Sequence, residues 1–494
     1  MISLPILIPL LFGILCLAAW NSLRIQKLLS LVGPIALISV SSWMLIRIRD
    51  VGIQSLQIGN WPAPFGISLV IDLFSAIMVT IAAIVALAIA CYSQVGIDKQ
   101  RANFGFYPLF FFLLMGVNGA FITGDLFNLY VWFEVMLMAS FVLIALGGER
   151  PQIEGAVKYV VLNLLSSTLF LVAIGLTYNL AGTLNMADLA LQLPKVSMQS
   201  QVTLIAILFL IAFSIKSAAF PLFFWLPASY HTPPVAITAL FSGLLTKVGV
   251  YALIRVFTLL FVQDISYTHT IILIMAGFTM VTGVLGAAAQ TDFRRLLSFH
   301  IISQIGYLLL GLGLFSQQAL AASIYFMIHV ILAKTALFFV AGIVNQIQGT
   351  YDLKKLGNLY SNRVGISLLF LIPALSLAGL PPLSGFFAKL GLIIAGYNLG
   401  QYGIVAVGLA VSFMTLYSMT KVWNEVFWKE KKLADPQNKP QPVSAWMVAP
   451  TIGLIVISLL LSIFTEPMMT LAHQAATQLM DPTLYITSVL GGKP

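Results

Sequence analysis

The sequence contains little charge for its length. Only 8% of its 494 residues are Asp, Glu, Lys or Arg, and 60% are hydrophobic, whereas a soluble domain carries about 25% charged residues. The net charge of +9 does not indicate nucleic-acid binding, because the basic residues are dispersed between apolar runs instead of clustered together. The composition excludes a soluble enzyme and a disordered chain, and it predicts a membrane protein with many spans.

Cysteine and nucleotide-binding motifs are also scarce. The two cysteines, Cys16 and Cys91, each lie inside an apolar run, which is typical of small buried side chains. Two distant cysteines cannot bind an iron–sulfur cluster by themselves, and no glycine-rich phosphate-binding loop follows a predicted strand. We therefore expect no cofactor and no metal site, and we expect an ion transporter instead of an enzyme.

Long apolar windows make up most of the sequence. About fourteen of them reach the length of roughly 20 residues that a membrane-spanning helix needs. They predict an all-α membrane protein with about 14 transmembrane helices, followed by a short interfacial tail at 467–494. The windows are 2–22, 27–48, 66–92, 105–124, 126–148, 157–181, 202–224, 235–258, 267–289, 297–315, 319–345, 363–398, 400–428 and 443–465.

The basic residues are distributed unevenly between the two sides of these windows. Of the 25 Lys and Arg residues, 15 fall in odd-numbered loops and 5 fall inside windows. Cytoplasmic loops carry an excess of Lys and Arg, so we predict a multi-pass protein of the bacterial plasma membrane with both termini outside. The five basic residues assigned to the outer side are Arg47, Arg49, Lys195, Arg255 and Lys493.

Several ionisable residues lie deep inside apolar windows, where a charge costs about 2.5–3.5 kcal/mol. Glu134 lies about eight residues, or roughly 12 Å, into its window, and a histidine can both donate and accept a proton. We interpret the set as a proton relay. The alternatives are a structural carboxylate paired with a neighbouring helix, lysines that extend to the interface, and an ordinary core histidine. The predicted relay residues are Glu134, Lys216, Lys247, His329, Lys334 and Lys389.

Prolines interrupt two of these windows beside a deep lysine. Pro221 follows Lys216 by five residues, and Pro381 and Pro382 precede Lys389. Proline removes a backbone donor, and a broken helix at membrane depth is tolerated where it lines a cavity or packs in protein. Broken helices in both halves of a chain indicate inverted repeats. We predict an N-terminal three-helix segment (1–104), two inverted five-helix repeats that each form a half-channel (105–258 and 259–428), and a last helix with a tail (429–494).

A few polar residues outside the predicted relay can each be interpreted in two ways. Asp72 is either an access group or a helix cap, and His231 either gives access to Lys216 or orders its loop. The role of His300 stays open. Glu425 follows Lys421 by four residues, a spacing that predicts an ion pair on one helix face.

Four segments carry a resemblance to a known family. They read GDLFNLYVWFEVMLMASF, FSIKSAAFPLFFWLPASYHTPPVAITALFSGLLTKVGVYALIR, TDFRRLLSFHIISQIGYLLLGLGL and LAGLPPLSGFFAKLGLI. The sequence resembles the antiporter-like subunits shared by respiratory complex I and the multisubunit Mrp cation/proton antiporters. The resemblance implies a partnership with other membrane subunits (A to G type) and exchange of cytoplasmic Na⁺ for external H⁺.

The resemblance also implies roles for the deep residues. Glu134 would pair with Lys216 and tune its proton affinity, and Lys216 and Lys247 would carry the proton through the first half-channel. His329 and Lys334 would connect to Lys389 in the second. The alternatives are a proton-pumping subunit of complex I or of a membrane-bound hydrogenase, a symporter for an organic solute, and a structural anchor.

Overall fold

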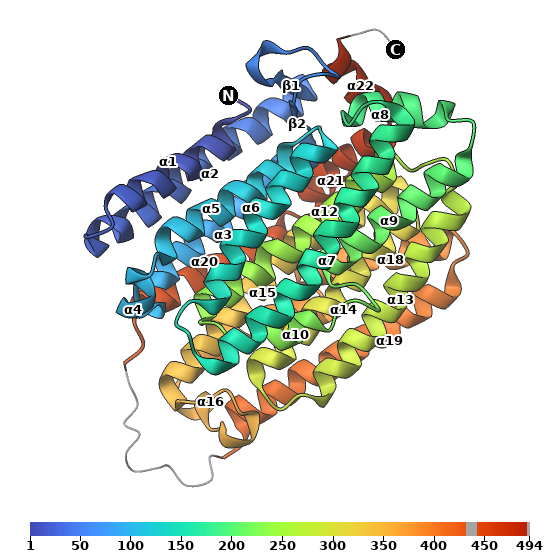
Figure 1. Ribbon diagram of the computed structural model, residues 1–494. Coiled ribbons are helices and arrows are strands. Elements are labelled where there is room, and N and C mark those ends of the chain that lie inside the picture. The colour runs from blue at the N-terminus through green and yellow to red at the C-terminus, as the bar shows by residue number, and fades with distance from the viewer. Residues whose placement is uncertain (431–441, 492–494) are drawn as a thin grey trace.

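The chain folds into a bundle of membrane-length helices (Figure 1). The computed structural model describes residues 1–430 and 442–491. Within these ranges, 11 helices are long and apolar enough to cross a membrane, and three shorter apolar helices accompany them. The prediction of an all-α membrane protein with about 14 spans is therefore confirmed. Four basic residues of the charge count lie outside the described residues: Lys431, Lys432, Lys439 and Lys493.

The N-terminal segment holds three helices and a hairpin. The helices are α1 (Leu4–Ala18), α2 (Leu23–Val51) and α3 (Leu73–Gly96). The expected span at 66–92 is wrong at its start, because Ser68–Ile71 forms strand β2, paired antiparallel with β1 (Gln54–Gln57). A short 3₁₀ turn, η1 (Ile58–Asn60), follows β1. Asp72 then caps α3 by accepting a hydrogen bond from the Ser75 backbone N–H at 2.8 Å.

The first half of the bundle contains five passes, of which the fourth is broken and the fifth contains a π-helical turn. Its elements are α4 (Lys99–Asn103), α5 (Phe106–Ile122), α6 (Leu126–Ala145), α7 (Arg150–Ala181), α8 (Met186–Gln192), η2 (Leu193–Lys195), α9 (Gln199–Ser217), α10 (Trp225–Ser229), α11 (Val235–Leu240), the π turn η3 (Phe241–Leu245) and α12 (Thr246–Leu259).

The second half also contains five passes, and again the fourth is broken. The expected single span at 363–398 is two helices, because Gly379 and the two prolines interrupt it. The elements are α13 (Ile265–Ala289), α14 (Phe293–Gly313), α15 (Gln317–Gln348), η4 (Leu353–Lys355), α16 (Leu359–Asn362), α17 (Val364–Ala378), α18 (Ser384–Asn398), α19 (Tyr402–Trp423) and the π turn η5 (Asn424–Trp428).

Corresponding loops in the two halves are bridged in the same way. Asp125 caps α6 and forms an isolated antiparallel bridge with Asn185, and Asp292 caps α14 and forms one with Asp352. The first bridge lies at the end of the bundle that carries both chain termini, which we call the termini end (Figure 1). The second lies at the opposite end, because an odd number of passes separates them.

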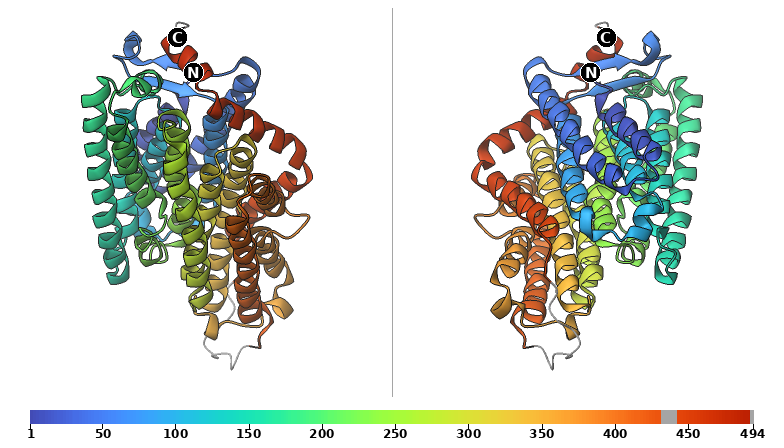
Figure 2. Two further views of the ribbon diagram at one scale, coloured as in Figure 1. Left: turned by 90° about the vertical axis from the view of Figure 1, so that its right-hand side faces the viewer. Right: turned by 90° about the vertical axis from the view of Figure 1, so that its left-hand side faces the viewer.

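The C-terminal residues are more than an interfacial tail. After α20 (Ala445–Ile463), the chain forms α21 (Thr465–Met480) and α22 (Pro482–Leu490), seen in red at the side and termini end of the bundle in Figure 2. Ala472, Ala475 and Ala476 are fully buried, and their spacing places small side chains on one face of α21. This face packs closely against α15, so the tail belongs to the bundle.

Candidate proton-transfer site

The first helix break fixes the position of Lys216. α9 ends at Ser217 because Ala218 adopts a left-handed conformation (φ 60°), and Pro221 lies in the break before α10. The indole Nε1 of Trp225 donates to the carbonyl of Ile215 at 3.0 Å. This bond satisfies a carbonyl that the interrupted helix leaves free, so the broken segment is held in place by packing and hydrogen bonding.

Within the described chain, the hydrogen-bond acceptors of Lys216 are neutral oxygens. Its Nζ donates to Ser167 Oγ at 3.0 Å and to the carbonyl of Asn163 at 3.4 Å, both on α7. It also lies 5.5 Å from the ring centre of Phe133. Lys216 borders a cavity of about 20 Å³, which is enough for about one water molecule. A proton on this nitrogen therefore has polar groups and space around it.

Glu134 lies beside this group without joining it. It follows Phe133 on α6, it is half-buried, and its Oε1 has no hydrogen-bond partner among the described residues. No carboxylate of the described residues lies within 4.0 Å of Lys216. The structure thus brings Glu134 into electrostatic range of Lys216 but leaves the two charges unpaired.

The π turn positions Lys247. Its Nζ donates to the carbonyl of Ser242 inside η3, five residues earlier in the chain. Gly243 in the same turn faces α15, and a Cβ there would lie 2.8 Å from Thr335 Oγ1. The close approach puts Lys247 next to the part of α15 that carries Lys334. A π turn of this kind is common at functional sites.

The central helix α15 carries the next two predicted relay residues. Lys334 is fully buried, and its Nζ donates to the carbonyl of Leu297 on α14 at 3.3 Å. His329 Nδ1 shares a hydrogen bond of 2.9 Å with Ser384 Oγ, at the start of α18. Its Nε2 is buried without a partner in the described part of the chain. His329 therefore links α15 to the second broken helix and keeps one ring nitrogen free.

The second break resembles the first, except that its lysine lies on the half-helix after the break. α17 ends at Ala378 before Gly379 (φ 90°), and Pro381 and Pro382 lie in the gap before α18. Lys389 Nζ donates to the carbonyl of Ala378 and to Ser412 Oγ, both at 3.2 Å. It lies 4.6 Å from the ring centre of Tyr307 on α14. The acceptor Ala378 is the last residue of a half-helix, where the helix dipole favours a cation.

A polar face on α14 joins these groups and was not predicted in full. His300 Nε2 shares a 2.6 Å hydrogen bond with Ser418 Oγ, while both amide atoms of Gln304 and the hydroxyl of Ser303 are buried without partners among residues 1–430 and 442–491. With Tyr307 these residues recur at i, i+3, i+4 and i+7, which places them on one helix face. That spacing in SFHIISQIGY is the sequence signal that identifies them.

The two predicted access residues have different surroundings. Asp72 is 1% exposed and forms an ion pair of 2.6 Å with Arg255. The assignment of Arg255 to an outer loop is wrong, because α12 extends to Leu259 and buries it. His231 lies in the loop before α11, where burial lowers its pKa and Nδ1 has no partner in the described chain.

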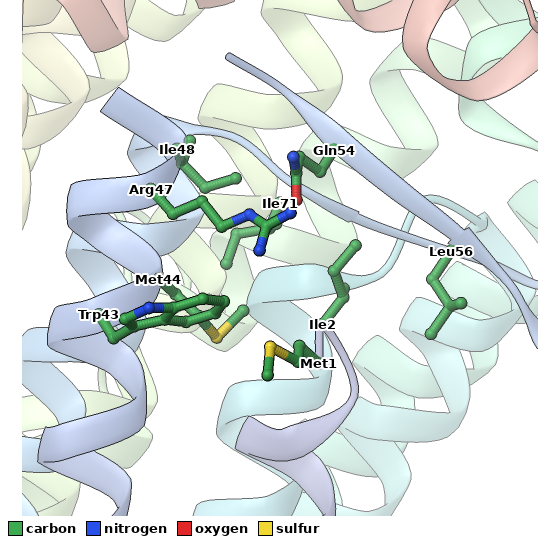
Figure 3. A pocket seen from close by; sticks show the side chains of 9 residues that line it. All are labelled: Met1, Ile2, Trp43, Met44, Arg47, Ile48, Gln54, Leu56 and Ile71. Carbon is green, nitrogen blue, oxygen red and sulfur yellow. The ribbon is translucent and has the colours of Figure 1, made fainter. Parts of the chain in front are cut away.

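Two further features lie outside the relay. The predicted Lys421–Glu425 pair is wrong: Lys421 donates to the Ala288 and Gln290 carbonyls, and Glu425 pairs with Lys429 at 2.6 Å. A cavity of about 330 Å³ lies between the N-terminus, α2 and the hairpin (Figure 3). Its lining includes no predicted relay residue.

Comparison with known proteins decides the family. The family model for the transmembrane region of NADH:quinone oxidoreductase and Mrp antiporters matches residues 123–415. The chain belongs to this family. It is 46% identical over 490 residues to the D subunit of a Na⁺/H⁺ antiporter from Alkalihalophilus pseudofirmus, and 39% identical over 489 residues to its counterpart from Bacillus subtilis. Each match covers 99% of both proteins. Within the family, the loop LPASYHTPPVAI predicts the D-type subunit, and these relatives confirm it.

Chains of three solved membrane complexes have the same fold. A chain of the Mrp complex from Dietzia sp. DQ12-45-1b is 31% identical with a TM-score of 0.94, and each chain is covered to 99%. A chain of the membrane-bound sulfane sulfur reductase, an archaeal respiratory membrane complex, is 26% identical with a TM-score of 0.92 and the same coverage. A chain of respiratory complex I from Thermus thermophilus is 22% identical with a TM-score of 0.83, covering 97% of this chain and 100% of that one, and it supports the fold alone.

Proposed function

We propose that this chain is the proton-translocating membrane subunit of a multisubunit Na⁺/H⁺ antiporter, and that it exchanges cytoplasmic Na⁺ for external H⁺. It acts as a transporter subunit without enzymatic chemistry of its own, beside other membrane subunits of the A to G type. The relatives that match it over 99% of their length carry the name of such a subunit. The location is the bacterial plasma membrane, with both termini outside.

One observation carries the proposal. The four deep lysines each donate to a backbone carbonyl, and within the described chain none has a carboxylate within 4.0 Å. A buried carboxylate in contact would hold each lysine in its charged form. Neutral acceptors keep the nitrogen in position whether or not it carries the proton. The lysines are Lys216, Lys247, Lys334 and Lys389.

Glu134 acts as the movable counter-charge of this relay. When its carboxylate moves toward Lys216, the lysine retains its proton, and when it moves away, the proton passes toward Lys247. It then reaches Lys389 by way of Lys334, His329 and the polar face of α14. A cation that binds to a neighbouring subunit biases this switch electrostatically, and the coupling of the two binding free energies is reciprocal.

The two halves of the relay correspond to two inverted repeats, at 105–258 and 259–428, between the N-terminal segment (1–104) and the C-terminal part (429–494). The matched helix breaks and the matched bridges at Asp125 and Asp292 support this division. Five passes per repeat invert the second copy relative to the first.

The test is Na⁺-driven proton movement in vesicles that contain the complete complex. Lys216→Ala should abolish exchange while the complex still assembles. Lys158→Ala is the matched control, because Lys158 is exposed and pairs with Glu154 on the surface of α7. Exchange at the wild-type rate in Lys216→Ala would contradict the proposal.

A proton pump of a respiratory or hydrogenase complex is the second candidate, supported by the likeness to a chain of an archaeal respiratory complex. Mass spectrometry of the subunits that co-purify with the chain separates the two. Membrane subunits alone support the antiporter, whereas flavin or iron–sulfur subunits in the complex support the pump.

A further inference from the structure

A second charged cluster continues the face of α12 that carries Lys247. Tyr251 and Arg255 follow Lys247 by four and eight residues, so all three lie on one helix face and Arg255 is roughly 12 Å farther toward the termini end. Arg255 Nη1 lies 2.6 Å from Asp72 Oδ2, and both side chains are at most 5% exposed. The pair ties α12 to the start of α3.

Hydrogen bonds hold this ion pair in one arrangement. Arg255 Nη2 donates to the Tyr251 hydroxyl at 3.0 Å and to Ser75 Oγ at 3.3 Å. The Tyr251 hydroxyl in turn donates to the carbonyl of Phe121 at the end of α5 at 2.6 Å. Three passes, α3, α5 and α12, are therefore joined at one point.

Aromatic rings pack against Tyr251, which lies between Lys247 and Arg255 on the face of α12. The rings of Phe74 and Phe121 lie 4.7 Å and 5.0 Å from the ring of Tyr251, and all three side chains are at most 2% exposed. The face of α12 between Lys247 and Arg255 is therefore covered by buried aromatic side chains.

The C-terminal helix covers the pair from the other side. The ring of Tyr485 on α22 lies 5.5 Å from the Arg255 guanidinium, and its buried hydroxyl has no partner in the described chain. α22 is fixed to the hairpin, because Ser55 Oγ donates to the Ser488 carbonyl at 2.6 Å. Among the described residues, the buried carboxyl of Asp125 also faces the cluster.

A buried ion pair contributes little to stability compared with apolar side chains of similar volume, and its best supported use is to specify or switch a state. The position of this pair, in line with Lys247 and beneath a cover, suits a switch. We propose that Asp72 and Arg255 form a gate that separates Lys247 from the solvent at the termini end. The gate rests on the proposed function. Tyr251 and Tyr485 are positioning residues that keep it closed, and separating the pair opens it.

The test measures proton flux in proteoliposomes of the complete complex under an imposed pH gradient, without Na⁺. The neutral double variant D72N/R255Q avoids an unpaired buried charge. It should raise this flux about tenfold, which corresponds to about 1.4 kcal/mol of barrier, and weaken the coupling of Na⁺ to H⁺. The charge-swapped variant D72R/R255D should restore a low flux. Arg49→Gln, at the same end with an exposed pair, is the matched control.

Normal flux and normal coupling in an assembled double variant would overturn the gate. If the double variant does not accumulate, Tyr251→Phe decides, because it keeps the ring and removes only the hydroxyl that holds Arg255. Wild-type flux in Tyr251→Phe then overturns the gate. Absence of Na⁺ exchange in the wild-type complex would instead reject the proposed function. Glu134→Ala is the reference variant, because it should lose Na⁺ exchange while the gate stays closed to proton flux.

Discussion

Gly385 is the residue at which the second helix break leaves least space. It is the second residue of α18, next to Ser384, which bonds to His329. A Cβ at position 385 would lie 1.9 Å from the carbonyl oxygen of Ser376 and 2.8 Å from His329 Nε2. Heavy atoms cannot approach this closely, so Gly385→Ala must push α18 away from α17 and from α15.

The expected loss of exchange in Gly385→Ala follows from the backbone shift that the new Cβ requires. The Ser376 oxygen belongs to a helix backbone, and no side-chain rotation relieves the clash. Overpacking of a core costs about 1–3 kcal/mol, and we expect the upper end here. If this strain energy adds to the barrier for proton transfer, an increase of about 2.7 kcal/mol lowers the exchange rate by about 100-fold.

The assay compares Na⁺/H⁺ exchange and thermal unfolding of the purified complex for two glycine variants. Gly453→Ala on α20 is the control, because a Cβ there meets nothing within 4 Å, and alanine is favoured over glycine in a helix by about 1 kcal/mol. We expect unchanged exchange in the control and loss of exchange in Gly385→Ala. Exchange near the wild-type rate in Gly385→Ala would show that the His329–Ser384 contact is not needed.

Four further variants test the relay in the same vesicle assay. Glu134→Ala should abolish exchange, and Glu134→Asp should retain part of it, because the shorter carboxylate keeps its charge but loses reach. Complete loss in the aspartate variant would show that reach, and not charge alone, sets the switch. Lys389→Ala should abolish exchange with normal assembly, and a normal rate would exclude the second break from the relay. Gln304→Leu should slow exchange without lowering the unfolding temperature, because neither amide atom has a partner to lose in the described chain; normal exchange would show that the polar face of α14 is not part of the path.

Much of the site was predictable because the membrane makes its residues conspicuous. A lysine in an apolar run is costly, so Lys216, Lys247, Lys334 and Lys389 could be read directly from the sequence, and prolines beside two of them indicated the breaks. The hydrogen-bond partners of these lysines could not be predicted. They are mostly backbone carbonyls, such as that of Ala378, whose exposure depends on where a helix ends.

The errors in the fold have a common physical origin. Hydropathy does not distinguish a short apolar strand from the start of a span, so Ser68–Ile71 was included in a helix. It also assigns a charge near the end of a window to a loop, which is how Arg255 was misplaced. In the structure, Asp72 compensates that arginine, and the two are 183 positions apart in the sequence. Pairing across such a distance follows only from the packing of α3 against α12.

In the proposed relay, the choice of acceptor accounts for how one chain could hold several lysines at membrane depth and still move a proton. A carbonyl oxygen is neutral and belongs to a rigid helix, so it fixes the lysine nitrogen and favours its charged form less strongly than a carboxylate would. Two of these carbonyls lie where regular helix geometry is interrupted, at the end of α17 and in the π turn that faces Lys247. The other two, those of Asn163 and Leu297, lie inside α7 and α14. The half-buried carboxylate of Glu134, by contrast, has an oxygen that no hydrogen bond within the described chain holds in place. In the proposed relay, fixed neutral acceptors and one movable charge would therefore place control of the proton at the first break.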